Sequence, residues 1–145
     1  MSVRINATLR FTRWEGQRFV DRIPRILGNY GQALGTQLHE EINTAQFTWP
    51  RTTRRRNGQQ VSSPRDIYDT GEFDRSQTLS TGGRNRLTFR WNPTSDSGFP
   101  YARVIFTGYT TSKGTVVPGR DWITPALTNQ PPARFFAEQW ASLGR

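Results

Sequence analysis

Hydrophobic and polar residues alternate over residues 101–107, YARVIFT, where aromatic and β-branched side chains dominate. This pattern predicts a central strand that ends at Gly108. Residues 109–117 are mostly polar, so we expect an extended, exposed loop there. The sequence Pro118-Gly119-Arg120 then predicts a rigid corner that turns the chain towards Trp122.

The hydrophobic period changes to that of a helix between Val20 and Ala45. Apolar residues recur at steps of three and four and form one stripe: Val20, Ile23, Leu27, Tyr30, Leu34, Leu38, Ile42 and Ala45. Asp21 is the expected N-cap, and Pro24 lies in the first turn. Three interior glycines weaken a helix, so they predict close approach of a strand or helix from the same subunit or another copy: Gly28, Gly31 and Gly35.

Shorter patterns predict the remaining elements. Residues 2–11 alternate weakly, which indicates an edge strand in an N-terminal arm, residues 1–19, that either covers the sheet or reaches a neighbour. Residues 77–80 and 87–91 predict two strands around a turn at Thr81-Gly82-Gly83. The second strand has two faces, one with Leu87, Phe89 and Trp91 and the other with Thr88 and Arg90.

Residues 133–143 predict a short C-terminal helix that begins after Pro131-Pro132, with an inner face made of Phe136, Trp140 and Leu143. Together these patterns predict one α+β domain, residues 1–145. A long N-terminal helix packs on an antiparallel sheet, with long exposed loops at 51–63 and 109–117.

Composition limits the class of protein. The 145 residues suffice for one core, and five Trp, nine Phe and four Tyr supply bulky side chains although only 33% of residues are hydrophobic. The net charge is +9, and of 20 basic residues only Lys113 is a lysine. Arginine favours planar contacts with carboxylates and phosphates, so an acidic protein surface and nucleic acid both remain possible partners.

Several classes of site are excluded. The chain has no cysteine and a single histidine, His39, so disulfides, zinc ribbons and histidine-rich metal sites are ruled out. His39 beside Glu40 and Glu41 is interpreted as a surface cluster. Neither a transmembrane segment nor an apolar signal region is visible, so we expect a chain made and kept in the cytoplasm unless something larger carries it out.

Residues 51–63 form a polar, basic stretch with a predicted turn at Asn57-Gly58. Its arginines, together with one lysine of the later loop, are the candidate partner contacts: Arg51, Arg54, Arg55, Arg56 and Lys113. Three interpretations remain open: a solvated mobile loop, docking to an acidic partner, or contact with DNA phosphates. Replacing residues 54–56 with serine is expected to leave the subunit folded.

An acidic cluster lies in the next segment: Asp66, Asp69, Glu72 and Asp74. We interpret it as turn capping by Asp69, with Gly71 at positive φ, and as ion pairing with the flanking Arg65 and Arg75. A metal-dependent nuclease is the alternative, but no lysine or histidine lies nearby in sequence to assist it. We therefore expect no enzyme, metal or cofactor.

Three short motifs follow the long helix in order. They are D-T-G-x-ϕ-x-x-S at Asp69–Ser76, a segment from Tyr101-Ala102 to Gly108, and P-x-R-x-ϕ-ϕ-x-P-A at Pro118–Ala126. Their order resembles the virion-morphogenesis family of tailed bacteriophages, the small neck and tail-completion proteins. The resemblance covers roughly residues 20–143. It implies an α+β subunit assembled into a closed ring without catalysis.

The resemblance further implies a structural virion protein in the head–tail connector, which joins the portal-side complex to the tail around a channel for DNA. Expected partners are copies of the chain, as a hexamer or dodecamer, and other neck and tail proteins, assembled in the host cytoplasm. We expect neither sequence-specific DNA binding nor a membrane. The alternatives are a tail-terminator ring and an arginine-rich DNA-binding module. Candidate corner or interface residues are Asp69, Gly71, Ser76, Tyr101, Gly108, Gly119, Arg120 and Trp122.

Overall fold

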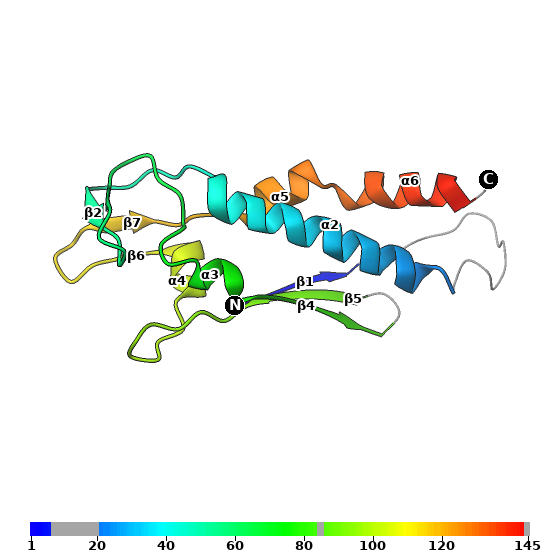
Figure 1. Ribbon diagram of the computed structural model, residues 1–145, viewed down its shortest axis with the longest axis horizontal. Helices are drawn as coiled ribbons and strands as arrows, with labels where there is room; N and C mark the ends of the chain where they lie inside the picture. Colours follow the sequence, from blue (N-terminus) through cyan, green and yellow to red (C-terminus); the bar gives the residue numbers. More distant parts are fainter. Residues whose placement is uncertain (7–20, 84–85, 144–145) are drawn as a thin grey trace.

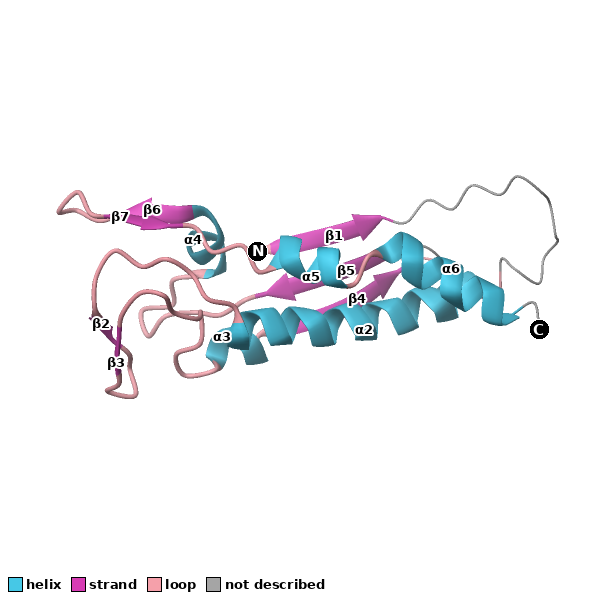
Figure 2. Cartoon of the chain, turned by 90° about the horizontal axis from the view of Figure 1, so that it is seen from above, coloured by secondary structure: helices cyan, strands magenta, loops and turns pink. Residues whose placement is uncertain are grey.

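The computed structural model describes residues 1–6, 21–83 and 86–143, and it confirms the mixed α+β class. A long helix, α2, lies over a small antiparallel sheet, and two C-terminal helices run along α2 (Figures 1 and 2). The described elements are β1 Ser2–Asn6, α2 Ile23–Thr44, β2 Thr53–Arg54, β3 Gln60–Val61, α3 Glu72–Arg75, β4 Gln77–Gly82, β5 Arg86–Trp91, α4 Ala102–Thr107, β6 Gly108–Thr110, β7 Val116–Pro118, α5 Ile123–Asn129 and α6 Pro132–Leu143.

Helix α2 buries the predicted apolar stripe. Its most buried apolar side chains are Ile26, Leu27, Tyr30, Leu34, Leu38 and Ile42. The helix begins three residues later than expected, and Arg22 rather than Asp21 is the N-cap, without a side-chain capping bond. The start at Ile23 places Pro24 in the first turn, where a missing N–H leaves no hydrogen bond unmade. Val20, where we expected the helix to begin, lies outside the described residues.

The glycines of α2 differ in their surroundings. A Cβ added at Gly31 would lie 3.0 Å from the Leu79 side chain and 3.1 Å from that of Leu87, so this part of the helix packs directly on the sheet. Gly35 also faces the sheet, with Phe89 at 3.5 Å. The close approach predicted from the sequence is therefore confirmed for these two glycines. It is wrong for Gly28, whose added Cβ would meet nothing within 4 Å.

Gly28→Ala is expected to raise the free energy of unfolding by about 0.5–1 kcal/mol, because alanine favours the helix and no neighbour must move. Gly31→Ala is the matched control and is expected to gain less, since the buried Leu87 side chain must shift. Urea unfolding of both variants measures the difference. A larger gain at Gly31 would contradict this packing.

The three-stranded sheet has the order β1-β5-β4, and both pairings are antiparallel. The predicted inner face of β5 is confirmed, because Leu87, Phe89 and Trp91 are almost fully buried. The predicted outer face is confirmed only for the exposed Arg90, since Thr88 is also buried, at 6% exposure. The N-terminal ammonium of Met1 donates a hydrogen bond to the carbonyl of Trp91 at 2.9 Å and so fixes the start of β1. Residues 7–11 of the expected edge strand, like most of the N-terminal arm, lie outside the described residues.

The C-terminal part forms two helices where one was predicted. Helix α6 begins at Pro132 as expected, Phe136 is buried and Trp140 packs against the core. Its aromatic residues meet Tyr30 of α2, with ring centroids 5.3 Å away for Phe135 and 5.7 Å for Phe136. Helix α5 was not predicted; it packs its buried Ala126 into the same core.

The predicted central strand at residues 101–107 is wrong, because this segment forms helix α4. Tyr101, Ala102, Ile105 and Phe106 all contact the core, and their spacing is also that of one helical face. A seven-residue apolar run fits both periods, so packing decides between them. The strand that does follow, β6, begins only at Gly108.

Both regions predicted as extended loops contain short hairpins. β2 pairs with β3 within residues 51–63, and β6 pairs with β7 around residues 109–117. Gly58 and Gly114, with φ of 88° and 78°, occupy the turns of these hairpins. Figure 1 shows both hairpins at the end of the molecule opposite the C-terminus.

Candidate protein-interaction site

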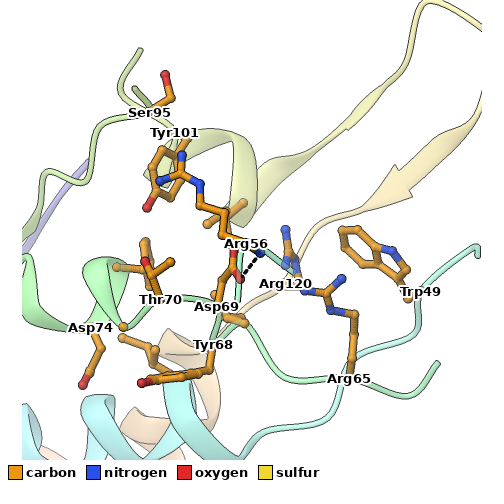
Figure 3. Close-up of a pocket in the computed structure, with 15 residues that line it drawn as sticks. Trp49, Arg56, Arg65, Tyr68, Asp69, Thr70, Asp74, Ser95, Tyr101 and Arg120 are labelled. Carbon is orange, nitrogen blue, oxygen red and sulfur yellow. Dashed lines mark hydrogen bonds between the residues drawn. The ribbon is translucent and has the colours of Figure 1, made fainter. Parts of the chain in front are cut away.

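The three motifs, far apart in sequence, meet at the end of the molecule that carries the hairpins. They line a cavity of about 320 Å³, to which Asp69, Gly71 and Phe73 come from the first motif, Tyr101 and Ile105 from the second, and Arg120 from the third. Figure 3 shows Asp69, Tyr101 and Arg120 around the cavity, with Trp49 and Arg65 at one side.

Two glycines hold the second and third motifs against each other. Gly108 pairs with Pro118 at the start of the β6–β7 hairpin and has φ of 75°. A Cβ added there would lie 2.5 Å from the backbone nitrogen of Gly119 and from the carbonyl oxygen of Val117. The Arg120 N–H donates to the carbonyl of Ile105 at 3.0 Å. The base of this hairpin is thus fixed by direct backbone contact, as the sequence predicted for a rigid corner.

Trp122 is the centre of an aromatic cluster under the cavity. It is fully buried, and three rings meet it edge-on: Phe73 at 4.9 Å, Trp91 at 5.5 Å and Phe106 at 5.5 Å between centroids. Asp121 accepts hydrogen bonds from the N–H groups of Ile123 and Thr124, each at 2.9 Å. Burial opposes ionisation of Asp121, but its hydrogen bonds with Thr124 and Ile123 outweigh burial and lower its pKa.

The first motif forms a tight turn into α3. Gly71 has φ of 77°, as predicted, and Ser76 donates a hydrogen bond to the carbonyl of Phe73 at 2.7 Å. The predicted role of Asp69 as a local cap is wrong. Its carboxylate instead accepts from the backbone N–H of Arg56 at 3.0 Å, which ties the turn to the β2–β3 hairpin.

The acidic residues are each bound separately. Asp66 pairs with Arg55 and Asp74 with His39, whereas Glu72 accepts from the Thr94 N–H at 3.1 Å. The sequence predicted Arg65 and Arg75 as the ion-pair partners of these carboxylates. The structure instead pairs Arg55 with Asp66 and His39 with Asp74. Within the described part of the chain, no three His, Cys, Asp or Glu residues are placed to hold a metal ion.

The candidate partner contacts do not form one exposed basic cluster. Arg51, Arg54 and Lys113 are exposed, the last at the far end of the β6–β7 hairpin. Arg56 is also exposed and lies 3.3 Å from the exposed carboxylate of Asp96. Arg55 is not available to a partner, because its side chain is 8% exposed and pairs with Asp66.

Arg55→Ser is expected to lower the free energy of unfolding by about 2–3 kcal/mol, because it leaves the Asp66 carboxylate without its partner in a partly buried site. The expectation that residues 54–56 can all be replaced without cost to folding is thereby revised. Arg54→Ser is the matched control from the same hairpin and should change stability by less than about 0.5 kcal/mol. Chemical unfolding of the two variants tests this, and equal stabilities would show that the pair contributes nothing.

Sequence reasoning missed Trp49 and Arg65, which lie beside Arg120 (Figure 3). The Arg120 guanidinium lies 4.5 Å from the centre of the Trp49 ring, and that of Arg65 lies 4.7 Å from it. Burial, and then the neighbouring charge of Arg65, lower the pKa of Arg120 to about 10, which still leaves it charged at neutral pH. No pattern in the sequence predicts this contact, because Arg65 and Arg120 lie 55 positions apart in the chain.

Of the predicted corner residues, Asp69, Gly71, Tyr101 and Arg120 line this cavity, and Trp122 packs against its lining residue Phe73. Ser76, Gly108 and Gly119 do not line it, and the predicted partner contacts are spread over two hairpins. Among the described residues, no helix combines the length and apolar character needed to cross a membrane. No protein-family model matches this chain, and no curated protein or solved structure is significantly similar to it.

Proposed function

We propose that this chain is a structural virion protein that forms a ring in the head–tail connector of a tailed bacteriophage. The observation that supports this most is the convergence of the three motifs on one rigid corner at the base of the hairpins. The site offers packing and backbone contacts, with each carboxylate of the acidic segment bound to a neighbour. This arrangement suits a subunit that positions surfaces for assembly.

A closed ring requires one face of each subunit to meet a different face of the next, with a rotation that closes. The helix-and-sheet body can supply the lateral faces, because the hairpins lie at one end of its long axis and the C-terminal helix reaches the other (Figure 1). The hairpins then point along a direction in which an adjoining ring can contact them. Their exposed arginines, Arg51 and Arg54, suit ion pairing with such a ring.

The mechanism of the proposed ring is geometric. Subunits assemble, adapt the portal side to the tail side, and leave a central channel through which DNA passes. Nothing in this role requires a base-specific contact, because the arginines need only meet carboxylates or phosphates.

The mass of the purified protein tests this proposal, measured by native mass spectrometry alone and after mixing with isolated phage tails. We expect a hexamer or dodecamer in at least one condition, with ring-shaped particles by negative-stain electron microscopy. A tail-terminator ring would bind the end of the tail without joining the portal-side complex. A protein that stays monomeric and unbound in both conditions would contradict the proposal.

A DNA-binding module is the second candidate, favoured by the exposure of Arg51 and Arg54 on the same hairpin. Binding to duplex DNA through phosphates falls steeply with salt. If the free protein binds duplex DNA weakly or not at all but does form rings, the connector is favoured. Tight binding by a monomer that weakens with salt, and is lost in Arg51→Gln with Arg54→Gln, would favour the DNA-binding module.

A further inference from the structure

Arg120 is a buried cation without an anionic partner. The residue is 6% exposed, and within the described part of the chain its guanidinium has neither a hydrogen-bond acceptor nor a carboxylate. Its Nε is fully buried and unpaired. Buried charges in proteins are normally paired and hydrogen-bonded, so this side chain is the clearest unmet polar group of the cavity.

A second arginine makes the lack of an anion more costly. The guanidinium of Arg65 shares the Trp49 ring with that of Arg120, and its own Nε is also buried and unpaired. Within the described residues, its side chain donates one hydrogen bond, from Nη1 to the Thr53 hydroxyl at 2.6 Å. Two like charges repel one another in this poorly solvated place, and an anion between them would relieve that repulsion.

The other cavity residues indicate which anion fits. The lining carries apolar surface from Ile42, Ile67, Phe73 and Ile105 beside the arginines. A carboxylate on a methylene chain can pack against this surface while its two oxygens meet the planar guanidinium groups. Asp69 and Asp74 also line the cavity and disfavour a second negative charge, which counts against phosphate.

We propose that the Arg120–Arg65–Trp49 cavity binds one aspartate or glutamate side chain from an acidic segment of an adjoining protein. This inference rests on the proposed function, in which another neck or tail protein meets the hairpin end of the subunit. A second copy of this chain is the poorer donor, because a chain with 11 acidic and 20 basic residues offers fewer carboxylates than an acidic segment does.

The proposal is tested on the full chain with N-acetyl-L-glutamate α-amide as the probe. Its neutral counterpart N-acetyl-L-glutamine amide and inorganic phosphate are the comparison ligands. In ¹H–¹⁵N spectra we expect the Arg120 Nε–H and Trp49 indole signals to shift saturably with the glutamate probe, with Kd on the order of 1 mM. Saturation at the same concentration by the glutamine amide, or tighter binding of phosphate, would overturn the carboxylate assignment.

Two variants locate the site. Arg120→Lys keeps the charge but loses the planar guanidinium group, so it should raise Kd at least about tenfold. Arg65→Gln should raise Kd to a similar extent and serves as the test if Arg120→Lys does not fold. Arg25→Gln, an exposed arginine in the first turn of α2 that does not line the cavity, is the control and should leave Kd unchanged. Unchanged binding in both site variants would overturn the inference. If the protein forms rings but does not bind the probe, the carboxylate site is refuted and the ring is not. If the protein binds the probe but stays monomeric, the ring is refuted and the site is not.

Discussion

We expect Trp122→Ala to lower the free energy of unfolding by about 3–5 kcal/mol, the largest effect of any single truncation in this chain. The indole is fully buried and lies against three other rings, so its removal leaves a cavity that the rigid corner cannot close. Trp122 joins parts of the core that are distant in sequence: Phe73 in α3, Trp91 at the end of β5 and Phe106 in α4. Urea unfolding monitored by circular dichroism measures the change.

Phe99→Ala is the control for this prediction. Phe99 is also a large aromatic residue, but it is 55% exposed, so its truncation should change stability by less than about 1 kcal/mol. Similar losses in the two variants would show that Trp122 is not the centre of the core at this end of the molecule.

The second large effect is expected for Gly108→Ala, at about 3 kcal/mol or more. Two costs combine here. The backbone has φ of 75°, where an L side chain is strained, and the added Cβ would lie 2.5 Å from the Gly119 nitrogen. The atoms that the added Cβ would meet belong to the backbone of residues 117–119, at the end of β7, so the substitution should separate β7 from β6 at the base of the hairpin. Unfolding free energy measures the loss, and proteolysis of the β6–β7 hairpin should accelerate.

Gly114→Ala separates the two costs. Gly114 has nearly the same φ, 78°, but an added Cβ there meets nothing within 4 Å. Its substitution should therefore cost only the backbone strain, about 1 kcal/mol. If Gly108→Ala and Gly114→Ala cost the same, the close contact between Gly108 and Gly119 does not stabilise the corner.

The sequence predicted those elements whose periodicity extends over many residues. The stripe of α2 runs for six turns, and its glycines already indicated close packing, which Gly31 and Gly35 confirm. The alternation in β5 correctly predicted that Leu87, Phe89 and Trp91 are buried, but it did not predict the burial of Thr88 between them. In both cases the pattern reflects a single neighbouring surface along the whole element.

Residues 101–107 could not be assigned from their pattern, because a short apolar run satisfies a strand and a helix alike. The cavity was equally hidden. Its glycines and Trp122 were predicted as a rigid corner. The contact of Trp49 with Arg120 was not, because the two residues lie 71 positions apart in sequence, and the contact of Trp49 with Arg65 spans 16 positions. The sequence could not show that Arg55 pairs with Asp66 either, because a run of charged residues does not indicate which of them form ion pairs. This pairing removes Arg55 from the predicted exposed cluster.

We propose that the rigid corner, the two projecting hairpins and the excess of arginine all serve the assembly of this protein with other virion proteins. The central claim is that the chain is a component of the finished phage particle. Quantitative mass spectrometry of purified particles, followed by labelling of the protein for electron microscopy, tests that claim most directly. We predict a fixed copy number of six or twelve per particle, with the label at the junction of head and tail; absence of the chain from infectious particles would contradict the account.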